Sequence, residues 1–304
     1  MLTNLRGLLT TSLFNFREKM EVANLLRLFT IAQANPQETM SAWLDRHLTQ
    51  PRVREFAATI IRISTFAVDL ECLNAQIALR QVASALKDNV LYLDGGWQTL
   101  VDGLVERART LGVDIRCGQP APNPDAIDAT GIVLATGPEA VEKMTGIAIP
   151  AGRSVRMASL DLGLEGLPEA STTTAFPLDQ PLYFGTHSAS ARLAPKGGRM
   201  VHVAKYLGGS APDAKTVRAE LEEFATLAIP QWRQHTKFVR FLPDLLITSM
   251  MPTAAPRPDS NFLGLNRVAL AGDWVGPEGM LADTAVASAL AAANQLQRRK
   301  AVAA

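Results

Sequence analysis

The feature that most constrains this 304-residue chain is a strand-turn-helix pattern near its end, in residues 267–296. Val268–Ala271 is a short apolar run that predicts a buried strand, and a turn-rich loop from Gly272 to Gly279 follows it. From about Leu281 the sequence predicts a helix with an alanine-rich apolar face, which allows close packing. The residues of that face are Ala282, Ala285, Val286, Ala289, Ala293 and Leu296.

Two physical properties make this turn a candidate ligand site. The N-terminus of a helix has unpaired backbone N–H groups and a partial positive charge, which suit an anionic or carbonyl-bearing ligand. Asp273 stands at the carboxyl end of the predicted strand, and an acidic residue in that position suits the hydroxyls of a ribose or ribitol. The spacing alone is equally compatible with a strand-turn-helix whose aspartate is simply solvated.

The residues of this segment, beyond their spacing, resemble a known sequence signature. The segment LAGDW, the loop after it and the alanine-rich helix with Ser288 resemble the C-terminal flavin-binding signature of one flavoprotein group. This group contains the amine oxidases, the protoporphyrinogen oxidases and the phytoene-desaturase-like dehydrogenases. Residues 92–116 (YLDGGWQTLVDGLVERARTLGVDIR) and 131–138 (GIVLATGP) resemble two further segments of the same group. The resemblance runs from about residue 40 to residue 300.

The resemblance implies an FAD-dependent oxidoreductase with a mixed α/β fold: an incomplete Rossmann-like FAD domain plus a substrate domain of mixed sheet and helices. Residues 1–90 would be the helical part of the substrate domain and 151–254 its sheet and helix. Residues 91–150 would be the middle segment of the FAD domain and 255–304 its C-terminal FAD-binding segment. A hydride would pass from an apolar or amine-bearing small molecule to the flavin, and the motifs name no catalytic side chain.

The same resemblance implies a set of cofactor-binding residues. Gly272 and Asp273 would lie against the ribityl-phosphate part of FAD. The backbone of Met280–Ala282 would approach the pyrimidine edge of the flavin ring and stabilise negative charge there. Trp274 would either flank the ring or cap the core. The remaining candidates are turn residues beside the cofactor: Gly95, Gly96, Trp97, Thr136, Gly137 and Gly279.

The most diagnostic element of that group is missing from this sequence. No two of the 21 glycines are two positions apart, so the sequence has no G-x-G-x-x-G turn for the FAD pyrophosphate. Three explanations are open: a truncated or mis-started gene product, a subunit completed by a second chain with the nucleotide-binding half, or a non-catalytic fragment or binding module unable to hold FAD. Where strands are absent, an exposed apolar patch is expected, and such a patch promotes association.

Composition and motifs narrow the remaining function classes. Lys and Arg number 30 against 29 Asp and Glu, so no strong positive field favours nucleic acid. No apolar run reaches the roughly 20 residues of a transmembrane segment, no signal peptide is evident, and two cysteines fit a reducing compartment, so the cytoplasm is the expected location. No HExxH, G-x-S-x-G or cysteine-pair motif predicts a metal site or a hydrolase. Among four isolated histidines, only His202 is expected near a site.

The rest of the chain alternates helical and strand patterns. Thr39 is expected to cap a short helix that starts at Met40, and Asp213 to start a longer one. Ile132–Ala135 is a continuous apolar run, which is typical of a strand covered on both faces. The other predicted strands are Val113–Cys117, Val155–Leu162, Pro181–Thr186, Met200–Tyr206, Phe238–Leu242 and Leu245–Met250.

Overall fold

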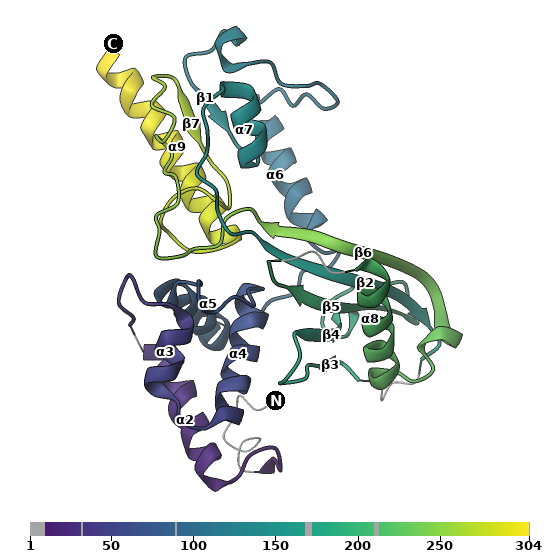
Figure 1. The fold of residues 1–304 in the computed structure, drawn as a ribbon. Coiled ribbons are helices and arrows are strands. Elements are labelled where there is room, and N and C mark those ends of the chain that lie inside the picture. Colours follow the sequence, from purple (N-terminus) through teal and green to yellow (C-terminus); the bar gives the residue numbers. More distant parts are fainter. Residues whose placement is uncertain (1–9, 32, 89, 168–171, 210–212, 304) are drawn as a thin grey trace.

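The computed structural model of this chain describes residues 10–31, 33–88, 90–167, 172–209 and 213–303. The first nine residues of the expected helical region therefore lie outside the described residues. The chain forms a group of helices (α2 to α5), an antiparallel sheet covered by α8, and a C-terminal unit built around β1, β7 and α9 (Figure 1). Parallel and antiparallel strands both occur, so the predicted mixed α/β fold is confirmed.

The helical group packs apolar faces against one another. It consists of α2 (Phe16–Ile31), α3 (Met40–His47), α4 (Pro51–Thr65) and α5 (Ala75–Asp88), with α5 in contact with each of the other three. Helical spacing puts large apolar side chains on the inner faces, where burial removes them from water. The largest side chains fully buried there include Trp43, Phe29, Phe56, Leu25, Leu44, Ile61 and Leu79.

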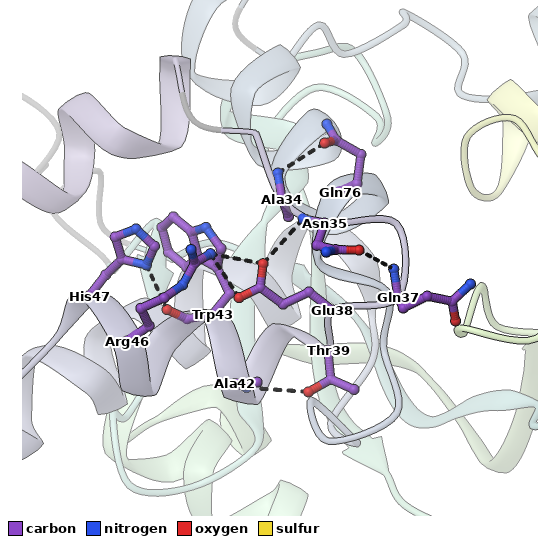
Figure 2. A network of polar contacts seen from close by, with 10 residues as sticks. All are labelled: Ala34, Asn35, Gln37, Glu38, Thr39, Ala42, Trp43, Arg46, His47 and Gln76. Carbon is purple, nitrogen blue, oxygen red and sulfur yellow. Dashed lines mark hydrogen bonds and ion pairs between the residues drawn. The ribbon is translucent and has the colours of Figure 1, made fainter.

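A short loop between α2 and α3 is fixed by its own side chains, as Figure 2 shows. The Thr39 hydroxyl accepts a hydrogen bond from the Ala42 N–H at 3.2 Å, which confirms Thr39 as the N-cap of α3. The Glu38 carboxylate accepts from the Asn35 N–H at 3.2 Å and pairs with the Arg46 guanidinium at 2.7 Å. These contacts fix the orientation of α3, whose apolar face packs on the other helices.

The antiparallel sheet has five strands in the order β3-β4-β5-β2-β6. The strands are β2 (Val155–Glu165), β3 (Thr174–Ala175), β4 (Leu182–Thr186), β5 (Gly198–Leu207) and β6 (Thr236–Thr248). Alternate residues of β2, β4 and β5 form a core with α8 (Ala214–Ala228) on one face of the sheet. Asp213 caps α8 as predicted, because its carboxylate accepts from the Thr216 N–H at 2.8 Å. The opposite face carries more polar side chains.

The two strands predicted at the end of this unit are one strand. β6 runs without a break through Pro243, a residue that has no N–H to donate to a neighbouring strand. β6 lies at the edge of the sheet, and one extra residue separates the partners of Ser159 and Met157, which are Leu242 and Leu245. An edge position with a bulge accommodates proline, so the proline does not end the strand.

The C-terminal unit joins two strands that are far apart in sequence. β1 (Ile132–Leu134) pairs in parallel with β7 (Val268–Leu270), and α7 (Pro138–Thr145) and α9 (Ala282–Ala303) follow them. β7 is buried throughout, but Val133 in β1 is 43% exposed, so the expectation that this strand is covered on both faces is wrong. Among the described strands, β7 is the only partner of β1.

The segment around α6 (Gln98–Thr110) departs most from expectation. The predicted strand Val113–Cys117 is wrong, because no described strand pairs with it and the segment stays irregular and exposed. Alternation of apolar residues forms a strand only where a neighbouring strand satisfies its backbone. The helix α6 itself forms, yet none of its residues is buried.

The packed face of α9 also differs from the predicted one. Thr284, Ser288 and Ala292 are buried, whereas Val286 is exposed and does not pack on the unit. Ala282, Ala289 and Ala293 are exposed as well. Leu296 does pack against the buried alanines of β7, as the apolar spacing predicts. The buried face is thus rotated toward two hydroxyl-bearing residues: Thr284 accepts a hydrogen bond from Arg257, and Ser288 bonds Gly272 on the turn before the helix.

Candidate functional site

The carboxyl ends of β1 and β7 bring two predicted turns together. The Ala271 N–H donates to the Leu134 carbonyl at 3.1 Å, which extends the pairing of the two strands. The Trp274 indole Nε1–H then donates to the Thr136 carbonyl at 2.9 Å. Thr136 and its neighbour Gly137, the N-cap residue of α7, therefore lie beside the turn that begins at Gly272. The carboxyl ends of parallel strands are the usual place for ligands in such sheets.

Trp274 is part of the core that surrounds this junction. Its indole is almost fully buried in a cluster with residues of β1, β7 and α7. Of the two roles expected for Trp274, the structure shows the indole capping the core. A contact between this residue and a cofactor stays a prediction.

Ser288 on α9 holds the turn from the other side. Its hydroxyl accepts from the Gly272 N–H at 3.0 Å and lies 2.9 Å from the Gly272 carbonyl. A Cβ atom at Gly272 would lie 2.9 Å from the Trp274 Nε1 atom, so a larger residue would push the indole out of place. The turn is therefore clamped between a helix hydroxyl and a buried indole. Ser288 carried part of the sequence pattern, but its role was not evident there.

Arg257 supports the loop that leads into α9. Its Nη2 atom donates to the carbonyls of Glu278 at 3.2 Å and Gly279 at 3.0 Å, and the residue is buried. Burial lowers the pKa of the Arg257 guanidinium, and the Asp273 carboxylate opposes this effect. Sequence reasoning missed Arg257, because nothing in the linker around it signals that the side chain folds back under the loop.

The backbone of the loop is held in an unusual conformation. Gly279 and Leu281 have φ angles of +62° and +60°, in the left-handed region. A Cβ atom at Gly279 would lie 2.7 Å from the Asp283 Cβ atom, so the loop requires glycine there. Leucine rarely adopts a positive φ, and such a residue persists only where its surroundings enforce it.

Contacts with the helical group hold the loop in this conformation. The Met280 side chain is buried in the core of α2 to α5, and its carbonyl accepts from the Gln81 Nε2–H at 3.3 Å. Gln81 also donates to the Asp283 carboxylate at 2.9 Å. The carbonyl groups of Glu278, Gly279 and Met280 are thus all engaged by protein donors.

The N–H groups at the same place have no such partners. Within the described part of the chain, no acceptor takes a hydrogen bond from the backbone N–H of Met280, Leu281 or Ala282. Ala282 starts α9, so these N–H groups lie at the positive end of a helix. The half-buried Asp273 carboxylate interacts electrostatically with Arg257 but forms no described side-chain hydrogen bond. Free amides and a free carboxylate are the groups that ring carbonyls and ribityl hydroxyls require, so the residues present fit that end of a flavin.

The Gly95-Gly96-Trp97 turn lies against a different part of the molecule. Gly95 and Gly96 have positive φ angles, and the Gly95 N–H donates to the Arg192 carbonyl at 3.1 Å. The Asp94 carboxylate accepts from the Arg192 backbone N–H at 2.7 Å and from its Nε atom at 2.9 Å. The turn is therefore anchored to the loop between β4 and β5, and no described hydrogen bond joins it to the turn after β7.

Two hollows lie near these elements. One, of about 250 Å³, is bordered by the loop at Val275–Glu278 and by α9. A larger groove of about 900 Å³ lies between α4 and the sheet, and none of the predicted cofactor residues lines it. Among the residues that the structure covers, no group of His, Cys, Asp and Glu side chains is arranged to hold a metal ion. In the same part of the chain, no helix combines the length and apolar character needed to cross a membrane.

Comparison with known proteins places the fold. No family model matches the chain, and no curated protein matches its sequence. Solved structures do match, and one is an oxidoreductase from Methanosarcina mazei at 13% identity with a TM-score of 0.68, covering 93% of this chain and 74% of that one. A putative protoporphyrinogen oxidase from Exiguobacterium matches at 13% identity and a TM-score of 0.64, covering 97% and 75%.

A third neighbour is a cyclohexylamine oxidase from Brevibacterium oxydans. It matches at 13% identity and a TM-score of 0.56, covering 96% of this chain and 77% of that one. The chain thus has the fold of these oxidoreductases, in agreement with the predicted fold class.

Proposed function

We propose that this chain is the substrate-binding and ring-binding part of an FAD-dependent oxidoreductase. The observation that carries the proposal is the set of free N–H groups at Met280–Ala282 beside the free Asp273 carboxylate, on a turn fixed by Ser288 and Arg257. Preorganised donors of this kind stabilise charge without reorganising when it develops. The oxidoreductase folds of the neighbours support the same function.

Each part of the turn has a role in this proposal. The Asp273 carboxylate would accept hydrogen bonds from the ribityl hydroxyls, and the Met280–Ala282 amides, with the positive end of α9, would stabilise negative charge on the flavin ring. When bound, FAD supplies the hydride-accepting chemistry. The sheet and the helical group orient an apolar or amine-bearing small molecule and exclude water. Thr136 and Gly137 shape the backbone turn beside this site, whereas Gly95, Gly96 and Trp97 shape a second turn beside the sheet.

The described residues provide no turn for the FAD pyrophosphate, so we propose that a nucleotide-binding segment from outside this sequence, such as a second chain, supplies it. The support is an exposed apolar surface on α6 and β1, where Leu104 is 70% and Val133 43% exposed. Among the described strands β1 pairs only with β7, so its other edge can take a further parallel strand. A strand-turn-helix segment placed there would cover both. The other apolar residues of this surface are Trp97, Leu100, Val101, Leu111, Val113 and Ile115.

The second candidate is a binding module that does not hold FAD. It is favoured by one observation, the lack of any G-x-G-x-x-G turn among the 21 glycines. In that case the sheet and helices bind a ligand without redox chemistry. The two candidates differ in flavin uptake, which is simple to measure.

The test is the absorbance of the purified protein at about 450 nm, where oxidised flavins absorb, before and after addition of FAD and gel filtration. We expect retained FAD, and anaerobic loss of this absorbance with cyclohexylamine as the probe substrate. Asp273→Asn should weaken FAD binding, whereas Asp125→Asn, at an exposed aspartate remote from the turn, should not. Protein that retains no FAD even at millimolar cofactor, neither alone nor together with a nucleotide-binding segment of the kind proposed, supports the binding module instead.

A further inference from the structure

The sheet face that points away from α8 carries a group of polar side chains in register. Asp161 of β2 lies directly opposite His202 of β5 on one side and Arg240 of β6 on the other. Residues directly opposite each other on neighbouring strands project from the same face of a sheet. The three side chains therefore meet at the centre of this face, and Asp161 is only 2% exposed there.

The Asp161 carboxylate is saturated with hydrogen bonds. One oxygen accepts from the Ser159 hydroxyl at 2.6 Å and from His202 Nδ1 at 2.7 Å. The other accepts from the Arg240 Nε and Nη2 atoms at 2.9 Å and 2.7 Å. Burial alone would raise the pKa of Asp161, but the bonds from His202, Ser159 and Arg240 outweigh it and hold the pKa well below its usual range. Asp161 is consequently ionised at neutral pH.

The ionised Asp161 carboxylate determines which ring nitrogen of His202 carries the hydrogen. The Nδ1 atom faces the carboxylate and must carry the hydrogen, so in the neutral ring Nε2 keeps its lone pair. No described residue donates to or accepts from Nε2, and the side chain is 30% exposed. An aspartate that orients a histidine in this way is the arrangement that makes the far nitrogen a proton acceptor.

The groups around His202 leave Nε2 without a competing charge. The His187 ring lies 4.6 Å from the His202 ring, and burial, with a smaller effect of His202, lowers the pKa of His187 to about 4 against the opposing effect of Asp161. The Tyr183 hydroxyl lies 3.3 Å from His187 Nε2, and burial raises the pKa of Tyr183. His187 and Tyr183 are therefore neutral at neutral pH, and Arg240 is paired with Asp161.

This cluster is continuous with one of the predicted cofactor segments. The Tyr92 ring lies 5.3 Å from the His187 ring. Tyr92 lies three residues before Gly95 of the glycine turn, and Asp94, next to that turn, is paired with Arg192 after β4. The open sheet face and the turn thus belong to one connected surface.

We infer that the open face of the sheet is a substrate subsite in which His202 Nε2 accepts a hydrogen bond from a hydroxyl or an amine N–H of the bound molecule. The inference deepens the proposed function and rests on it for its place in a reaction. When the bound O–H or N–H bond breaks, its proton passes to Nε2 and the electron pair stays on the substrate oxygen or nitrogen. Asp161 then stabilises the imidazolium that has formed.

The test uses the full chain labelled with ¹⁵N-histidine, because only four histidine rings have to be resolved by NMR. His202→Gln assigns the signals. Three probes of the same ring size are titrated: cyclohexanol and cyclohexylamine, which have donor groups, and cyclohexanone, which has none. We expect neutral His202 in the Nδ1–H form, with a saturable shift of its Nε2 signal by cyclohexanol, cyclohexylamine or both, and none by cyclohexanone.

Two variants separate a binding role from a purely structural one. Asp161→Asn frees the tautomer of His202 and should weaken probe binding about tenfold or more, the effect of one charge-assisted hydrogen bond. Asp125→Asn, at an exposed aspartate outside the sheet, is the matched control and should leave binding within about twofold. If Asp161→Asn does not fold, the tautomer and the three titrations on the unaltered protein still decide.

The inference is overturned by a neutral His202 in the Nε2–H form, by equal shifts from all three probes, or by no saturable shift from either donor probe. FAD retention is measured on the same sample. Retained FAD without a response of His202 refutes this subsite and leaves the proposed function standing. A response of His202 in protein that retains no FAD, neither alone nor with the proposed nucleotide-binding segment, supports the subsite and refutes the proposed function.

Discussion

Replacing Ser288 by alanine removes the hydroxyl that clamps the turn after β7. The Gly272 N–H then loses its acceptor at 3.0 Å, and the Gly272 carbonyl loses a neighbour at 2.9 Å. Ser288 is 3% exposed, so little water can replace the lost hydroxyl. A buried donor left without a partner costs about 1–3 kcal/mol.

Helix propensity acts in the opposite direction in this variant. Alanine is favoured over serine inside a helix by roughly 0.5 kcal/mol. The expected net loss in the free energy of unfolding is therefore about 0.5–2.5 kcal/mol. Ser84→Ala is the matched control, because Ser84 is an exposed serine inside α5 with only a long contact to Asp88. Ser84→Ala therefore gains helix propensity without losing a buried hydrogen bond.

The assay is urea unfolding followed by circular dichroism and tryptophan fluorescence, since Trp274 lies beside the clamped turn. We expect the Ser288→Ala midpoint to fall and the Ser84→Ala midpoint to stay or rise slightly. Equal midpoints for the two variants would refute the clamp, because the hydroxyl would then contribute nothing beyond its place in a helix. A fall in both would show that serine-to-alanine exchange itself is harmful.

Three further outcomes are expected. Gly279→Ala should destabilise the chain by about 1–2 kcal/mol in thermal unfolding, because its φ is +62° and its Cβ would meet Asp283, whereas Gly103→Ala in α6 has free space and should be neutral or stabilising. Burial lowers the folded-state pKa of His187 to about 4 from 6.5, so as the pH falls the unfolded chain binds a proton before the folded chain does. The free energy of unfolding should therefore decrease as the pH drops from 6.5 toward 4. His187→Gln should flatten this part of the plot of stability against pH, and an unchanged slope would contradict the burial argument. Leu104→Glu on the exposed face of α6 should reduce self-association in sedimentation without lowering the melting temperature, and a large loss of stability would mean that this face is packed after all.

The sequence predicts the elements whose information is local. Thr39 and Asp213 cap their helices as expected, because an N-cap needs only a side-chain oxygen at the right position. Strand β2 is predicted by alternation over its own residues. The strand expected at Val113–Cys117 fails, since a strand also needs a neighbour that the local pattern does not specify.

In the candidate site too, the sequence predicts the features whose information is local and misses the others. The junction of Thr136 with Trp274 follows from two apolar runs that pair in parallel, which a strand-turn-helix pattern can predict. Arg257 and Gln81 could not be found in this way, because they reach the loop from 21 and 199 residues away in the chain. His202 was singled out by its place in a strand, but its partner Asp161 lies 41 residues away and became evident only in the sheet register.

Met280 belongs to two parts of the molecule at once. Its side chain sits among the helices α2 to α5, while its backbone N–H lies on the turn that precedes α9. Because Gln81 of α5 also donates a hydrogen bond to the Met280 carbonyl, a sideways shift of α5 would move the backbone N–H groups of Met280–Ala282 as well. A small molecule that binds between these helices and separates them would thereby change the direction of the Met280–Ala282 N–H groups. Binding among the helices would then alter the electrostatic potential at the turn before α9.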